Sequence, residues 1–171
     1  MTDLDIVAFI TQAYGGDLAD PDYVFVDRQL EQRPYEMVFR EIRELDSVLV
    51  EESWTDPNYQ VSFGCRITLE ERSWALEISM LGPLAVFART GNRRWERLLY
   101  PNEDDLQPVE RQIFDVLGKH GITFPSRETL EHRLDMTLWI TDPENVRVYH
   151  ALFSDEDFVP WQFSPLYRRD F

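Results

Sequence analysis

The fold of this chain is decided by one stretch, residues 59–80, which reads YQVSFGCRITLEERSWALEISM. From Tyr59 to Glu70 apolar and polar residues alternate, and the alternation resumes from Ser73 to Met80. Because side chains of a β-strand point alternately to its two faces, the pattern predicts two strands that share one buried face. Only Glu71-Arg72 separates the two runs, so the strands are expected to form a hairpin.

Further strands are expected on both sides of this hairpin, around residues 48–54, 84–89 and 95–100. The turns that connect them are short, whereas a parallel crossover needs about a dozen residues or more. The strands must therefore run antiparallel. We predict a meander of about five strands.

Helical spacing of apolar residues marks three other segments, 2–14, 34–45 and 109–118, and a further turn or two is expected at 126–134. Thr2 is the expected N-cap of the first helix, and Gly15-Gly16 is its stop. Residues 23–26 are too short to assign. The 171 residues are thus expected to form a single α+β domain, an antiparallel meander sheet with helices packed on its apolar face.

Residues 146–153 fit two structures. Val146, Val148, His150 and Leu152 alternate as in a strand, while Val146, Tyr149, Leu152 and Phe153 have helical spacing. A strand is preferred, because Val, Tyr and Phe are common in strands.

Charge is the strongest functional signal. The chain has 32 acidic residues against 17 Lys and Arg, a net charge of −15, and residues 1–60 hold fourteen acids and four bases, or −10. Such a surplus creates a negative field that favours basic partners and repels nucleic acid and anionic membranes. A basic protein is the expected partner, with no direct contact to nucleic acid or membrane.

The location and redox state follow from the first residues and the cysteine count. Met1–Asp5 is acidic where a signal peptide would be basic, and no apolar run approaches the about 20 residues that cross a bilayer. We expect a cytoplasmic protein. The single cysteine, Cys65, lies on the apolar face of the clearest strand and is expected to be buried and unreactive.

No catalytic, metal-binding or cofactor-binding motif is present. The three histidines lack zinc-ligand spacing, and no phosphate-binding glycine loop or nucleophile elbow occurs. We expect no catalytic residues, no metal and no cofactor, so a pair of carboxylates brought together by the fold is the one chemistry left open. The acidic runs are expected to lie mostly in solvated loops, except that Glu51-Glu52 would put one carboxylate on the buried face of a strand. These runs are Asp20-Pro21-Asp22, Glu51-Glu52, Glu103-Asp104-Asp105 and Asp155-Glu156-Asp157.

The C-terminal stretch is too aromatic for a free tail and is expected to pack back over the domain. Its aromatic residues are Phe158, Trp161, Phe163, Tyr167 and Phe171.

Two segments carry a resemblance. They are residues 74–84, WALEISMLGPL, and residues 148–155, VYHALFSD, with Pro160-Trp161 after them. They are similar to stretches in small cytosolic immunity proteins of bacterial polymorphic toxin systems. The resemblance implies a protein that binds a cognate toxin, often a nuclease whose basic active site is covered by acidic residues.

Charge and resemblance together predict a non-enzymatic acidic protein that neutralises a basic toxin by covering its active surface. The surface assigned to the partner is formed by Asp20, Asp22 and Asp27, joined by Glu103, Asp104 and Asp105. Two alternatives stay open. A nucleic-acid mimic would space carboxylates like phosphates along an elongated surface, and a carboxylate-based hydrolase would need two acids facing each other in a deep pocket.

Overall fold

The computed structural model describes residues 3–53, 55–91 and 94–156. The predicted cap Thr2, Trp54 and the aromatic C-terminal stretch lie outside the described residues. Five strands form one antiparallel sheet in the order β1-β2-β3-β4-β5, so the predicted meander and the α+β fold class are confirmed. The strands are β1 (Leu49–Glu52), β2 (Ser62–Leu69), β3 (Arg72–Ser79), β4 (Ala85–Gly91) and β5 (Arg94–Leu98). The helices are α1 (Asp3–Ala13), α2 (Val24–Gln32), α3 (Glu36–Arg43), α4 (Pro108–Lys119), α5 (Arg127–Glu131) and α6 (Val148–Leu152), with a 3-10 turn at Pro143–Asn145.

The central hairpin has the predicted phase. Cys65 pairs with Leu76 and Ile67 with Trp74, and all four side chains are buried on one face of the sheet. The turn lies one residue earlier than predicted: Leu69 pairs with Arg72, and Glu70 takes a φ of 57°. The apolar residues of the two strands thus share one face, as their sequence indicates, although Ser62, Glu77 and Ser79 on the other face are buried as well.

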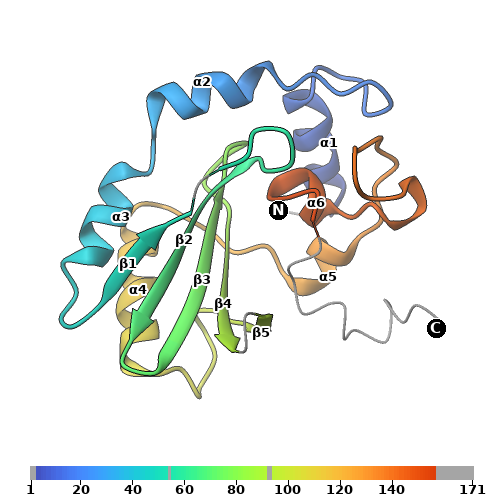
Figure 1. The fold of residues 1–171 in the computed structure, drawn as a ribbon. Coiled ribbons are helices and arrows are strands. Elements are labelled where there is room, and N and C mark those ends of the chain that lie inside the picture. The colour runs from blue at the N-terminus through green and yellow to red at the C-terminus, as the bar shows by residue number, and fades with distance from the viewer. Residues whose placement is uncertain (1–2, 54, 92–93, 157–171) are drawn as a thin grey trace.

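Helices α3 and α4 cover this apolar face (Figure 1). Val38, Phe39 and Ile42 of α3 are buried there, as are Ile113 and Leu117 of α4. These positions recur every three or four residues, which puts them on one side of each helix. We call this side of the sheet the covered face.

A second apolar cluster, which the sequence did not indicate, gathers α1, α5 and α6. It includes Ile6 and Ile10 of α1, the buried residues of α6, and Val86 of β4. Val86 lies between Ala85 and Phe87, which belong to the first cluster, so it points to the opposite side of the sheet. The Tyr14 hydroxyl donates a hydrogen bond to the Ala151 carbonyl at 2.7 Å and ties the end of α1 to α6.

The strand predicted for residues 146–153 is wrong: this segment holds α6. All five residues of α6 are buried, so the helix has no polar face that would interrupt the alternating pattern. Its first turn is closed by the Arg147 amide, which donates to His150 Nδ1 at 2.9 Å. Helix α2 was not assigned from the sequence because Val26 is its only buried residue.

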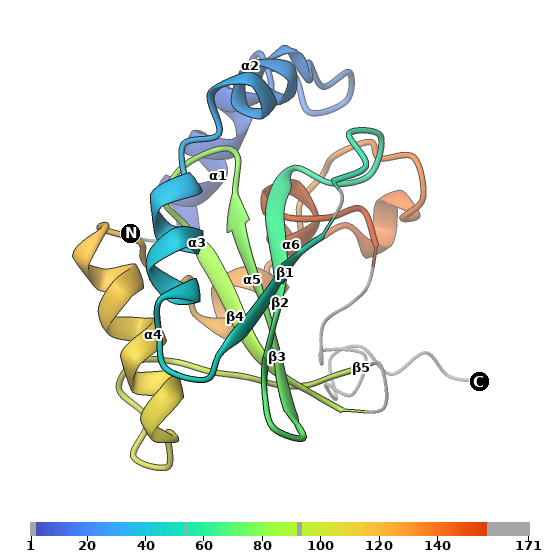
Figure 2. The same ribbon diagram turned by 60° about the vertical axis from the view of Figure 1, so that its left-hand side comes forward.

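None of the described helices is long and apolar enough to cross a membrane. The polar face of β2 and β3 carries a groove that the described helices leave open, and Figure 2 shows α3 and α4 on the other side of the sheet. We call the part of this side around the groove the open face; the second apolar cluster packs against the same side at Val86.

Candidate docking surface and groove

The six predicted partner-binding residues fall into two groups at opposite ends of the molecule. Asp20, Asp22 and Asp27 lie around the start of α2, at the top of Figures 1 and 2. Glu103, Asp104 and Asp105 lie in the loop between β5 and α4, at the bottom of both views. The structure therefore does not join them into one surface.

One arginine pairs with two acids of the lower group. Arg97 forms ion pairs with Glu103 at 3.1 Å and with Asp105 at 2.6 Å. A hydrogen bond from Arg97 lowers the pKa of Asp105. Arg111 donates to the Asp104 carbonyl at 2.9 Å. This loop is a structural connection between β5 and α4.

The upper group keeps its charge. Asp20, Asp22 and Asp27 are exposed, and within the described part of the chain no Lys or Arg forms an ion pair with them. Asp22 accepts a hydrogen bond from the Val24 amide at 2.9 Å just before α2 begins, so it also shapes the turn. Asp27 stands in the first turn of α2, where a negative charge is favourable.

A loop from the C-terminal third lies beside this acidic group. The Thr137 amide donates to the Leu18 carbonyl at 2.9 Å, which brings residues 137–142 next to residues 17–22. Two large apolar side chains of the loop face solvent: Trp139 is 79% exposed and Ile140 is 50% exposed. Exposed tryptophan of this kind is typical of protein interfaces.

The loop is held by Asp155. Its carboxylate accepts three consecutive amides, from Trp139 at 2.8 Å, Ile140 at 2.7 Å and Thr141 at 2.9 Å. Asp155 is only 5% exposed, so the prediction of a solvated residue is wrong. Three hydrogen bonds to one carboxylate compensate for its burial. They also fix the backbone that carries Trp139.

Exposed acidic residues come from the two segments that meet at this loop. Asp17, Asp20 and Asp22 come from the loop after α1, and Asp135, Asp142 and Glu144 come from either side of Trp139; all six are exposed. Residues 1–27 and 134–146 contain no Lys or Arg. We call Trp139, Ile140 and these six acids the Trp139 surface.

The open face carries a groove of about 350 Å³. Residues that line it include Ser62, Gly64, Arg66, Ser73, Ala75 and Glu77. Glu77 is 7% exposed, and burial raises its pKa to about 7. Within the described chain, it is the one carboxyl group at the groove. The pair of facing acids that the hydrolase alternative needs is therefore not found there.

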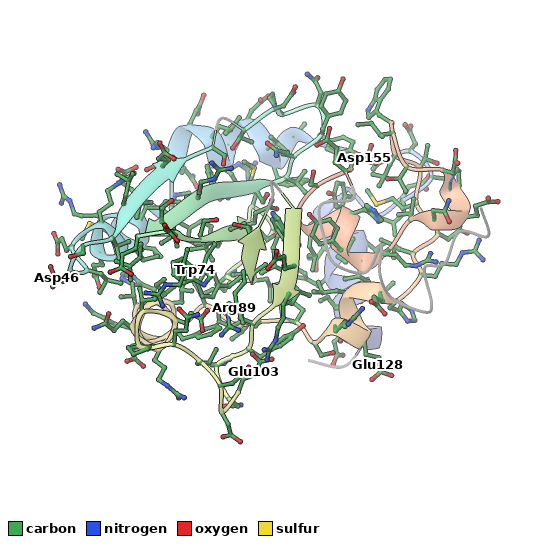
Figure 3. All side chains as sticks on the ribbon, turned by 60° about the horizontal axis from the view of Figure 1, so that its bottom comes forward. Asp46, Trp74, Arg89, Glu103, Glu128 and Asp155 are labelled. Atoms are coloured by element: carbon green, nitrogen blue, oxygen red, sulfur yellow. The ribbon has the colours of Figure 1, made fainter. Side chains whose placement is uncertain are left out.

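A second buried carboxylate lies on the covered side. Glu110 of α4 accepts hydrogen bonds from Trp74 Nε1 at 2.8 Å, from Arg89 Nε at 2.6 Å and Nη2 at 2.8 Å, and from the Gln107 amide at 2.7 Å. In Figure 3 the labelled Trp74 and Arg89 lie close together, while Glu103 and Asp155 are far apart. Glu110 is fully satisfied and anchors α4 to β3 and β4.

The remaining candidates are structural. Burial raises the pKa of Cys65 to about 12, which agrees with the predicted unreactive thiol. His120 lies 3.0 Å from Glu41, which also pairs with Lys119 at 2.9 Å, and this contact joins α4 to α3. Glu52 is exposed at the edge of the sheet and pairs with Arg33 and Arg43, so it is not a buried carboxylate. Over the described ranges no three His, Cys, Asp or Glu side chains form a metal-binding group.

Comparisons of the chain with protein-family models, with curated proteins and with solved structures found no match. The resemblance to immunity proteins stays a prediction.

The sequence pattern missed Trp139, Asp155 and Glu77. A signal for the first existed: the pair Trp139-Ile140 directly precedes the turn residues Thr141-Asp142-Pro143, where apolar side chains are less often buried. For Glu77 no signal existed, because alternation places it correctly on the polar face and does not show that this part of the face is enclosed.

Proposed function

We propose that this chain is a non-enzymatic acidic binding protein that neutralises a basic protein toxin, in the manner of the immunity proteins that it resembles. The Trp139 surface is the proposed docking site. The observation that carries the proposal is the exposed Trp139-Ile140 pair, whose backbone amides buried Asp155 holds, beside a segment of exposed acids at 17–22.

Two physical effects support a docking role. A loop that is already fixed loses little conformational entropy on binding, so more of the contact energy appears as affinity. Exposed acids near an apolar anchor attract a basic partner over long range and raise the association rate above the roughly 10⁵–10⁶ M⁻¹s⁻¹ of neutral pairs. Trp139 and Ile140, the anchor, thus lengthen the lifetime of the complex. The acids of the Trp139 surface, its rim, raise the rate of encounter.

The charge distribution favours this function over a nucleic-acid mimic. A mimic needs carboxylates spaced along a continuous surface, whereas the two acidic groups lie at opposite ends of the molecule. Arg97 already pairs with two of the three acids of the lower group.

The test is affinity capture from cells of the source organism, with three versions of the tagged chain. The double variant Trp139→Ala/Ile140→Ala removes the anchor, and Leu49→Ala removes an equally exposed apolar side chain on β1, a separate part of the surface. A basic protein retained by the unmodified chain and by Leu49→Ala, and lost from the double variant, would support the proposal. Equal retention by all three versions would refute the assigned surface.

The rim is tested by kinetics with the captured partner. Asp20→Lys/Asp22→Lys should lower the association rate, and 0.5 M salt should lower it for the unmodified chain, because exposed charges are screened within about 8 Å at physiological ionic strength. Dissociation should change little. An association rate indifferent to both treatments would mean that the acidic surplus has no role in docking.

A further inference from the structure

The groove on the open face is separate from the Trp139 surface and has a floor of small residues. Gly64, Ser73 and Ala75 leave space above β2 and β3. A Cβ atom at Gly64 would lie 3.6 Å from Cβ of Ser53 and 3.7 Å from Cγ of Glu77, so these two side chains flank the gap left by the glycine. The groove volume, about 350 Å³, is at the lower end of the range for ligand sites.

Glu77 lies at this groove with one hydrogen-bond partner. In the described chain its carboxyl bonds only to Ser62 Oγ, at 3.1 Å, and the same hydroxyl lies 3.0 Å from the Phe153 carbonyl. A hydroxyl has one proton to donate, and a carbonyl can only accept. When Ser62 donates to Phe153, Glu77 must carry a proton to bond Ser62.

Burial favours the neutral form of Glu77. Burial is the main cause of its raised pKa, and the charge of Glu156, which follows α6, adds to it. Ser62 alone opposes the shift. Among the described residues that line the groove, the other charged one is Arg66, which is exposed on β2; Val86, which pairs with Glu77 from β4, is apolar. An opposite charge brought within about 4–6 Å of such a carboxyl favours its ionised form and is attracted to it.

We propose that the groove binds a cationic side chain, Arg or Lys, of an extended peptide segment, with Glu77 as its counter-ion. Such a segment fits along the small floor residues while its cation reaches Glu77. On binding, the carboxyl gives its proton to solvent and the ionised carboxylate pairs with the cation. This inference does not depend on the Trp139 surface.

The probe is the peptide acetyl-Ala-Arg-Ala-amide, compared with the same peptide in which neutral citrulline replaces arginine. Amide NMR signals of Gly64, Ala75 and Glu77 are followed during titration at pH 6 and pH 8. The arginine peptide should shift these signals and bind about tenfold more tightly at pH 8, because a proton competes with it below the pKa of Glu77. The citrulline peptide should bind at least tenfold more weakly at pH 8.

Two variants locate the effect. Glu77→Gln keeps the shape of the side chain and should abolish both the preference for arginine and the pH dependence. Glu51→Gln is the matched control. Glu51 lies on β1, pairs in register with Arg66 of β2 and is exposed. This variant should leave the preference for arginine and the pH dependence unchanged. Thermal unfolding of each variant verifies that it is folded. Absence of binding, equal binding of the two peptides, or an unchanged pH dependence in folded Glu77→Gln would each overturn the proposal.

Discussion

A buried glutamate lies on each face of the sheet, and the pKa values of the two shift in opposite directions. Burial raises the pKa of Glu110 on the covered face, but hydrogen bonds from Arg89, Gln107 and Trp74 outweigh it and the net pKa is lowered. On the open face Glu77 has one hydroxyl, burial dominates, and its pKa rises to about 7. The number of donors, and not burial itself, decides whether a carboxyl is a structural anion or a neutral acid that can respond to a ligand.

The largest expected change in the free energy of unfolding comes from removing the Glu110 carboxylate on the covered face. Glu110→Ala leaves Arg89 and Trp74 without their acceptor and should lower the free energy of unfolding by roughly 3–5 kcal/mol. Urea denaturation at pH 7 measures it. Asp115→Ala, at an exposed position of α4, is the control and should change stability by less than about 0.5 kcal/mol. A loss below about 1 kcal/mol for Glu110→Ala would mean that its four hydrogen bonds do not stabilise the packing of α4.

The next largest effect is a gain in the free energy of unfolding for Glu77→Gln, and it depends on pH. Folded Glu77 holds its proton more tightly than unfolded glutamate, whose pKa is near 4.5, so its stabilising contribution is full below that pH and is lost as pH rises through about 7. Glu77→Gln should match the unmodified chain at pH 4 and exceed it above pH 7, by up to roughly 3 kcal/mol. Chemical denaturation across pH 4–8 checks this. Equal stability of the two proteins at pH 8 would show that Glu77 ionises without cost.

The smallest effect is expected for the rest of the open face. Arg66 is exposed and has no ion pair among the described residues, so Arg66→Ala should change the free energy of unfolding by less than about 0.5 kcal/mol. The same denaturation series tests it. A loss above 1 kcal/mol would show that the open face contributes to folding, and would weaken the contrast between the two faces.

The sequence pattern predicted which strand residues lie on the covered face, because one two-residue alternation runs through both central strands. Alternation from Tyr59 to Met80 located Cys65, Ile67, Leu76 and Ile78 in the core, and short turns then required an antiparallel meander. The prediction failed at 146–153, where burial on every side erases the helical period.

The candidate sites were harder to predict because long-range contacts create them. Asp155 reads as a solvated acid in an acidic run, yet it binds amides 14 to 16 residues earlier. Asp20 and Asp22 were identified, but their apolar neighbours come from the loop at 137–142, far along the chain. No local pattern contains such a pairing.

Asp155 fixes the backbone of residues 139–141 and leaves most of the side chains there open to substitution. The carboxylate accepts hydrogen bonds from the backbone amides of residues 139–141, not from their side chains. Every residue except proline has such an amide. The Trp139 and Ile140 side chains can therefore be exchanged while the backbone keeps its shape, whereas Thr141 Oγ1 also donates to the Asp155 carbonyl at 3.3 Å. Substitutions at 139 and 140 can thus change what the loop exposes to solvent without changing its backbone, and proline is the one replacement that would remove an amide donor.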